Sequence, residues 1–152
     1  MKAGLFNGLL GLKALLLSFF LLGFAHQTLK AQEYKGNDLY YFGHAILKHD
    51  SLLLEKIQDN DLYYLCKSLM YFNDSTLVYV KNDDLYYLGR TLILPDVNEL
   101  EYIKQDDWYY FGAALKERTL PYLDNIKNDD IYYLGQAIFE KDPGYLEQIS
   151  QN

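Results

Sequence analysis

A 23-residue repeat occupies residues 38–152 and constrains the fold more than any other feature of the chain. The segment Asp-Asp-Trp-Tyr-Tyr-Phe-Gly at 106–112 returns in related form four more times. Its second aspartate, which we number position 1, recurs every 23 residues without insertion or deletion, at Asp38, Asp61, Asp84, Asp107 and Asp130. A fixed short period is typical of proteins built from stacked units, because one unit cannot bury its apolar face alone.

The apolar pattern inside each repeat favours a helix over a strand. The five repeats are 38–60, 61–83, 84–106, 107–129 and 130–152, called first to fifth below. Positions 2, 5 and 9 are large and apolar and position 6 is small, which places one apolar stripe on a helix. A strand would put position 7 on the same face, and there the residues are His44, Lys67, Arg90, Ala113 and Gln136. Position 7 and positions 10–12 vary freely, so we expect them to face solvent.

Polar residues divide each repeat into two elements. Aspartate at position 1 suits the N-cap of a first helix over positions 2–11. Position 13 is Asp50, Asn73, Asp96, Thr119 or Asp142, and it suits the cap of a short second helix over positions 14–20. The sequence therefore predicts an all-α solenoid of five helix-turn-helix repeats, with β-hairpin repeats as the alternative.

Stacked helices lie about 8–10 Å apart, so five repeats predict an arc on the order of 50 Å long. The fifth repeat ends without a polar capping helix, although terminal repeats normally need one. We therefore expect the apolar residues Leu146 and Ile149 to stay exposed and to allow self-association.

Two repeat families share features with these residues. The segment Tyr-Tyr-Leu-Gly-Gln-Ala-Ile at 132–138 resembles the first helix of tetratricopeptide-type repeats, although the period here is 23 residues rather than about 34. The whole repeat at 127–149 is similar to the DKNYW repeat of bacterial envelope proteins. The first resemblance implies stacked helices, and the second implies β-hairpins with no assigned activity.

The N-terminus has the pattern of a secretory signal peptide. Lys2 and Lys13 precede the apolar run Ala14–Ala25, which is shorter than the about 20 residues that a membrane-spanning helix needs. We predict a signal peptide at 1–25, cleaved after Ala25 or alternatively after Ala31, and a linker at 26–37. The expected location is periplasmic or secreted. An uncleaved segment that anchors the chain in the inner membrane is the alternative.

Composition excludes several classes of function. The formal net charge of −7 disfavours nucleic-acid binding, which needs clustered lysine and arginine. Cys66 is the single cysteine, and it replaces a glycine at position 6, so we expect a small buried residue rather than a reactive thiol. No catalytic constellation, metal-ligand spacing or phosphate-binding loop is visible in the sequence. We therefore predict a non-enzymatic protein without cofactor or metal.

Tyrosine is the most unusual component of the chain, with 16 residues. Position 3 lies beside the polar position 7 on a helix, so its tyrosines are expected to form a ladder on one surface. Tyrosine combines a large contact area with a polar tip, which suits protein recognition. The candidate binding residues are Tyr40, Tyr63, Tyr86, Tyr109, Tyr132 and Trp108, and the alternative is that these tyrosines only seal the seams between repeats. The sequence thus predicts binding of a protein or peptide, with a cell-wall or glycan-binding module as the alternative.

Overall fold

The computed structural model describes residues 36–149, which lie within one of two compact parts of the chain, Tyr34–Asn152. The predicted signal segment and residues 26–35 of the predicted linker lie outside the described residues. Over the described range the chain is all-α, with no strand, so the alternative of β-hairpin repeats is wrong. None of the helices in this range is long and apolar enough to cross a membrane.

Each repeat contributes one long helix and one short helical element. The long helices are α2 (Gly36–Lys48), α4 (Asn60–Tyr71), α5 (Asp83–Ile93), α6 (Asp106–Glu117) and α7 (Asp129–Glu140). The short element is an α-helix in the first repeat, α3 (Ser51–Leu54), and a 3₁₀ helix elsewhere. The 3₁₀ helices are η1 (Asp74–Tyr79), η2 (Leu100–Tyr102), η3 (Leu120–Asn125) and η4 (Pro143–Gln148).

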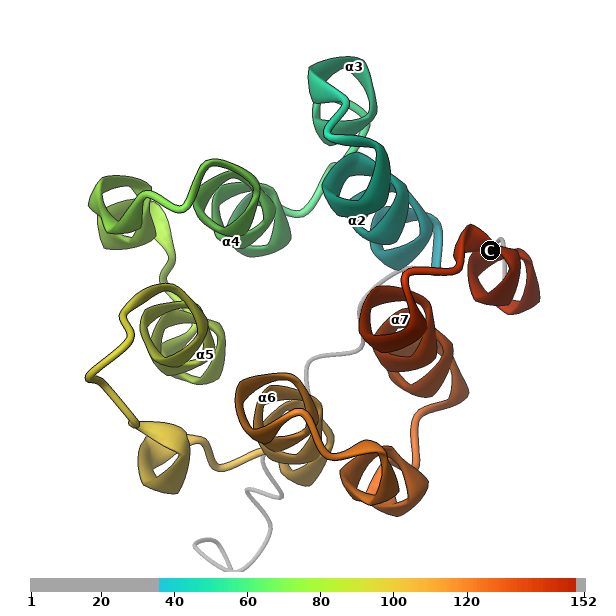
Figure 1. Ribbon diagram of the computed structural model, residues 1–152. Coiled ribbons are helices and arrows are strands. Elements are labelled where there is room, and N and C mark those ends of the chain that lie inside the picture. Colours follow the sequence, from blue (N-terminus) through green and yellow to red (C-terminus); the bar gives the residue numbers. More distant parts are fainter. Residues whose placement is uncertain (1–35, 150–152) are drawn as a thin grey trace, which may run out of the picture. The chain divides into compact units, whose positions relative to one another are not determined.

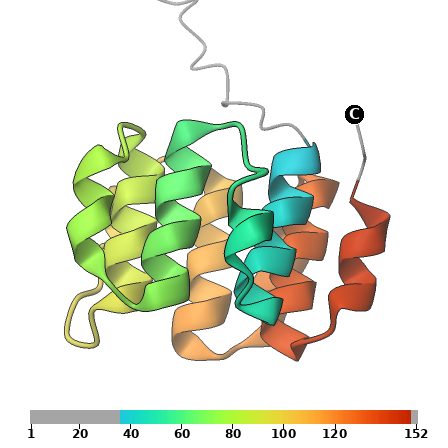
Figure 2. The same cartoon turned by 90° about the horizontal axis from the view of Figure 1, so that it is seen from above.

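The five long helices form a closed ring, not the open arc expected from the sequence. Each of them packs on the next, and α7 packs back on α2. Figure 1 shows these helices as an inner circle with the short elements outside it, and Figure 2 shows the long helices standing side by side.

Ring closure reuses the contacts that join neighbouring repeats along the chain. A Cβ atom on Gly89 would lie 2.5 Å from Leu77 Cδ2, so position 6 lies tightly against position 17 of the preceding repeat. A Cβ atom on Gly43 would lie 2.5 Å from Leu146 Cδ2, across the join between the fifth and first repeats. Leu146 and Ile149 are 0% and 2% exposed, so the expectation that they stay exposed is wrong. The first repeat covers the stripe that a terminal cap would otherwise cover.

The core contains the positions that the apolar pattern selects. Positions 2, 5, 17 and 20 are buried in all five repeats. They belong to a single apolar cluster of the described residues, and positions 3, 4 and 9 pack half-buried against it. Because every repeat contributes the same positions, the core continues around the ring.

Aspartate at position 1 does not cap its helix as predicted. Four of the five long helices, α4 to α7, begin one residue before it, and α2 begins two residues before it, at Gly36. The N-cap of those four helices is the residue before the helix starts, such as Asn82, whose side chain accepts from the Leu85 N–H. The aspartate instead accepts backbone N–H groups from the turn that ends its own repeat. Asp84 Oδ1 and Oδ2 accept from Lys104 and Gln105 at 2.9 and 3.1 Å. Asp38, Asp61 and Asp107 make equivalent bonds.

The predicted caps at position 13 are correct in three repeats. Asp50, Asn73 and Asp142 each accept the N–H two residues further on. Thr119 precedes η3 without a side-chain cap. Asp96 does not begin an element, because η2 starts later, at Leu100.

Candidate functional site

The position-3 tyrosines lie at the seams between repeats. All five are half-buried. In the second repeat, the hydroxyl of Tyr63 donates to Glu55 Oε1 of the first repeat at 3.0 Å. Across the ring closure, the hydroxyl of Tyr40 donates to Glu147 Oε1 at 3.4 Å. Burial, and then the neighbouring carboxylate, raise the pKa of both tyrosines. These rings therefore form part of the seams as well as part of the surface.

The position-4 tyrosines pack on the short element of their own repeat. The rings of Tyr64 and Tyr79 are 5.0 Å apart, and those of Tyr87 and Tyr102 are 5.2 Å apart. In the first repeat, position 19 is Lys56 instead of a tyrosine, and its Nζ lies 5.2 Å from the centroid of the Tyr41 ring. In every repeat the rings at positions 3 and 4 also meet edge to face. Each repeat thus has an aromatic pair on its long helix, and in the second and third repeats a ring of the short element extends this pair.

Trp108 is not available to a ligand. It is 0% exposed, and its ring meets that of Phe111 edge to face at 5.4 Å. It occupies position 2, where Leu39, Leu62, Leu85 and Ile131 are also buried. The prediction of Trp108 as a binding residue is therefore corrected: it is a core residue.

Sequence reasoning missed the most exposed tyrosines of the outer elements. Tyr79 and Tyr102 are 58% and 51% exposed, and both stand at position 19. The signal for them is an aromatic at position 19 in the second and third repeats only, since the others carry Lys56, Asn125 and Gln148. Each exposed ring rests on a half-buried position-4 ring, which holds it in place.

A polar hollow adjoins one of these aromatic pairs. It has a volume of about 570 Å³ and is lined by Gln58, Asp59, Asn60, Asp61, Tyr64, Tyr79 and Lys81. Some of its groups already have structural roles: Asp59 caps α4, and Asp61 accepts from the Lys81 N–H. The hollow combines an aromatic face with amide, carboxylate and ammonium groups.

Position 7 also lies at the seams, rather than in open solvent as expected. His44, Ala113 and Gln136 are buried, and Lys67 and Arg90 are half-buried. His44 Nε2 is 3.7 Å from Glu147 Oε1. Burial, and then the nearby Lys48, lower the pKa of His44 despite that carboxylate. The residues that vary at position 7 thus make the seams differ in charge, with a cation from Lys67 and Arg90 and a neutral side chain from Ala113 and Gln136.

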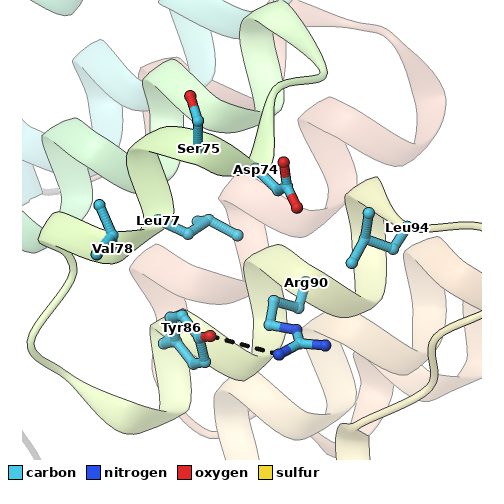
Figure 3. Close-up of a pocket in the computed structure, with 7 residues that line it drawn as sticks. All are labelled: Asp74, Ser75, Leu77, Val78, Tyr86, Arg90 and Leu94. Carbon is cyan, nitrogen blue, oxygen red and sulfur yellow. Dashed lines mark hydrogen bonds between the residues drawn. The ribbon is translucent and has the colours of Figure 1, made fainter.

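The seam between the second and third repeats differs from the other four. Position 18 of the preceding repeat is acidic at every other seam, as Glu55, Glu101, Asp124 and Glu147, but here it is Val78. A hollow of about 400 Å³ opens at this seam, as Figure 3 shows. Its lining residues are Asp74, Ser75, Leu77, Val78, Tyr86, Arg90 and Leu94.

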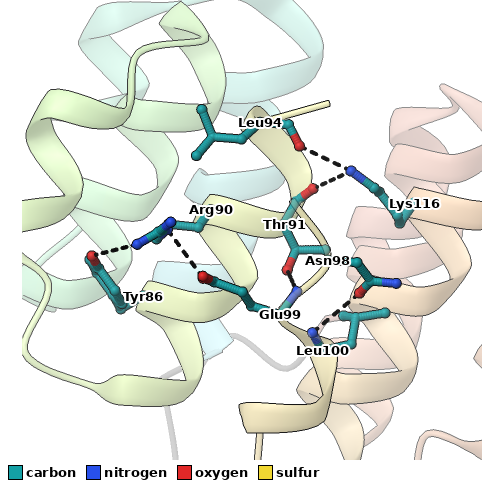
Figure 4. Close-up of polar contacts among 8 residues, drawn as sticks. All are labelled: Tyr86, Arg90, Thr91, Leu94, Asn98, Glu99, Leu100 and Lys116. Carbon is teal, nitrogen blue, oxygen red and sulfur yellow. Dashed lines mark hydrogen bonds and ion pairs between the residues drawn. The ribbon is translucent and has the colours of Figure 1, made fainter. Parts of the chain in front are cut away.

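Arg90 is held in this hollow from two sides. Its Nη1 donates to the Tyr86 hydroxyl at 3.4 Å, and its Nε is 3.1 Å from Glu99 Oε2 (Figure 4). The hydrogen bond with Tyr86, and then the carboxylates of Glu99 and Asp74, raise the pKa of Arg90. The guanidinium is therefore a fixed cation at the edge of the hollow.

Proline explains why the third repeat is irregular here. At position 12 the other repeats carry a left-handed residue with φ between 48° and 58°, as His49, Phe72, Arg118 and Lys141. Pro95 cannot adopt a positive φ, so α5 ends without that C-cap. Lys116 of α6 supplies the missing donors, with Nζ bonds to the carbonyls of Thr91, Leu94 and Pro95 at 2.8–3.2 Å. Figure 4 shows the bonds to Thr91 and Leu94.

Cys66 has a packing role. It is 0% exposed, and its Sγ donates to the Phe42 carbonyl of the preceding repeat at 3.7 Å. Burial raises the pKa of the thiol, which opposes formation of the reactive thiolate. Within residues 36–149, no group of three His, Cys, Asp or Glu side chains is placed to hold a metal ion.

Comparison of the chain with protein-family models, curated proteins and solved structures finds no match. The geometry of the ring and of its outer surface is therefore the basis for any conclusion about function.

Proposed function

We propose that the chain is a non-enzymatic, exported protein, built as a five-repeat solenoid closed on itself, that binds a protein or peptide through its tyrosine-lined outer face. The observation that carries this proposal is the pair of exposed rings, Tyr79 and Tyr102, at equivalent places on neighbouring repeats. Large aromatic residues held in one orientation are typical of the contacts that dominate protein interfaces.

The position-3 tyrosines Tyr40, Tyr63, Tyr86, Tyr109 and Tyr132 contribute the half-buried part of this face. Two of their hydroxyls donate to carboxylates, Tyr63 to Glu55 and Tyr40 to Glu147. Together with the net charge of −7, this favours a partner that offers basic and apolar groups.

Partner capture by matched variants tests this proposal. The exported chain is immobilised and exposed to an extract of the cell envelope, and retained proteins are compared among wild type, Tyr79→Ala/Tyr102→Ala and Tyr71→Ala. Tyr71 is 48% exposed at the end of α4, where its ring meets that of His49, and serves as the control. We expect capture by wild type and the control and loss of capture by the double variant, with helical circular dichroism unchanged. Equal capture by all three proteins would refute the assignment of this face.

A cell-wall or glycan-binding module is a second candidate, favoured by the hollow beside Tyr79. Sugars stack on aromatic rings and need both donors and acceptors around the ring, and Gln58, Asn60, Asp61 and Lys81 line this hollow. Co-sedimentation with purified peptidoglycan separates the candidates: retention that Tyr79→Ala abolishes supports the glycan.

Export has its own test. N-terminal sequencing of the protein recovered from the cell envelope or the medium is expected to begin at His26, after removal of residues 1–25. A start at Met1 in a membrane fraction would support the uncleaved anchor.

A further inference from the structure

The hollow between the second and third repeats has a charge pattern that the proposed function does not use. It places a fixed cation, Arg90, and an exposed carboxylate, Asp74, around an apolar surface. We propose that this hollow binds a free α-amino acid with an aliphatic side chain, whose carboxylate meets Arg90 and whose ammonium group meets Asp74. This site shares Tyr86 with the outer tyrosine face, but Tyr79 and Tyr102 do not line it.

Arg90 has donors left for a carboxylate. Of its five N–H donors, one on Nε faces Glu99 and one on Nη1 goes to Tyr86. Within the described part of the chain, Arg90 makes no other hydrogen bond or ion pair. The remaining N–H groups at the outer end of the guanidinium form the fork that binds a carboxylate in a bidentate manner.

Asp74 completes the match to a zwitterion. It acts on the pKa of Arg90 from across the hollow, yet the two side chains do not form an ion pair. Figure 3 shows them on opposite sides of the opening. Arg90, Glu99 and Asp74 together carry one net negative charge, which disfavours a ligand with a carboxylate alone. A zwitterion adds no net charge to the hollow. Its carboxylate would pair with Arg90, and its ammonium group would pair with Asp74.

The rest of the lining is mainly apolar, and it would contact the aliphatic side chain of the bound amino acid. Leu77 is buried beneath the hollow, Val78 is 73% exposed, and Leu94 is half-buried on the other side. Leu94 stands here because Pro95 ends α5 early. The volume of about 400 Å³ lies within the range of small-molecule sites, roughly 300–1,000 Å³.

Three small probes test this recognition by isothermal titration calorimetry on the exported chain. L-Leucine carries both charges, N-acetyl-L-leucine lacks the ammonium group, and L-leucinamide lacks the carboxylate. We expect leucine to bind and each of the others to bind at least about tenfold more weakly, since each loses one charge-assisted contact. N-acetyl-leucine also imitates a peptide C-terminus and leucinamide a peptide N-terminus. Equal or tighter binding of either would overturn the zwitterion assignment in favour of a peptide end.

Two substitutions of Val78 provide the decisive pair of variants. Val78→Glu restores the acidic residue found at the other four seams, so it is expected to fold as they do. It places a carboxylate beside Arg90 and is expected to abolish leucine binding. Val78→Thr keeps the shape without charge and is expected to bind leucine within about threefold of wild type, because the contact with Arg90 is untouched.

Asp74→Asn is the second test, because Asp74 is exposed and its loss does not disturb the core. We expect it to remove the preference for leucine over N-acetyl-leucine while the melting temperature stays unchanged. No binding of leucine to wild type at about 20 mM, well above the millimolar dissociation constants of weak ligands, would refute the site. That result would leave partner capture by Tyr79 and Tyr102 unaffected, so the two proposals fail separately.

Discussion

Closure of the ring predicts that two equivalent leucines, far apart in the sequence, contribute equally to stability. Leu146 packs across the join between the last and first repeats, and Leu77 packs across a seam between consecutive repeats. Both stand at position 17 and are 0% and 1% exposed. Substitution of either by alanine removes three buried carbon atoms, worth roughly 2.4 kcal/mol at about 0.8 kcal/mol each. The cavity left behind brings the expected cost to roughly 3–5 kcal/mol.

The assay is urea denaturation followed by helical circular dichroism. We expect Leu146→Ala and Leu77→Ala to lower the free energy of unfolding by the same amount within about 1 kcal/mol. In an open arc, Leu146 would lie at an uncovered end, and its loss would cost roughly 1 kcal/mol or less. A small effect for Leu146→Ala beside a large one for Leu77→Ala would therefore refute closure of the ring.

Three further predictions follow from single residues. Arg118→Gly is expected to raise the free energy of unfolding by about 0.5–1 kcal/mol in urea, because φ is 54° at this C-cap and glycine has no steric penalty there. Lys116→Met is expected to lower it by about 1–3 kcal/mol in the same assay, because three carbonyls at the end of α5 lose their donor. The control Lys127→Met, which removes an exposed ion pair, should change it by less than about 1 kcal/mol. His44 has a lowered pKa in the folded state, first from burial and then from Lys48, so the unfolded chain binds the proton more readily. The contribution of neutral His44 to the free energy of unfolding should be fully present above the ordinary histidine pKa of about 6.5 and should be lost as the pH drops below it. Urea midpoints between pH 7.5 and 5 should show this fall in wild type and a smaller fall in His44→Gln.

The helices and the core were predictable because they depend on periodicity within one repeat. Positions 2 and 5 face inward in every repeat, and positions 17 and 20 do so in the outer elements. Closure was not predictable in the same way, because it depends on the rotation between adjacent repeats, which must add up to one full turn over five steps. Contacts such as those of Leu146 with Gly43 and of Leu77 with Gly89 lie between repeats and contribute to that rotation. No local pattern in the sequence reports such an angle.

The role of position 1 was missed for a related reason. Asp84 and Asn82 are both good capping residues only two positions apart, so the sequence alone does not decide which one begins the helix. In the structure Asn82 is the N-cap of α5, and Asp84 accepts the backbone N–H of Lys104, 20 residues further along the chain. Trp108 was wrongly predicted as a binding residue because it is the single tryptophan of the chain. It stands at position 2, where the other repeats carry buried aliphatic residues, and this position already indicated the core.

A ring of equal seams offers five equivalent surfaces, so a specific site requires that one seam differ. The core positions vary little, and three departures from the repeat pattern affect the place where the second and third repeats meet. Val78 replaces an acid, Arg90 brings a fixed cation, and Pro95 shortens α5 and places Leu94 at the hollow. Pro95 also brings the bonds of Lys116 to the carbonyls at the end of α5. Because the other four seams close the ring without such residues, ring closure alone does not require them, and the amino-acid site proposed at this seam would give them a role.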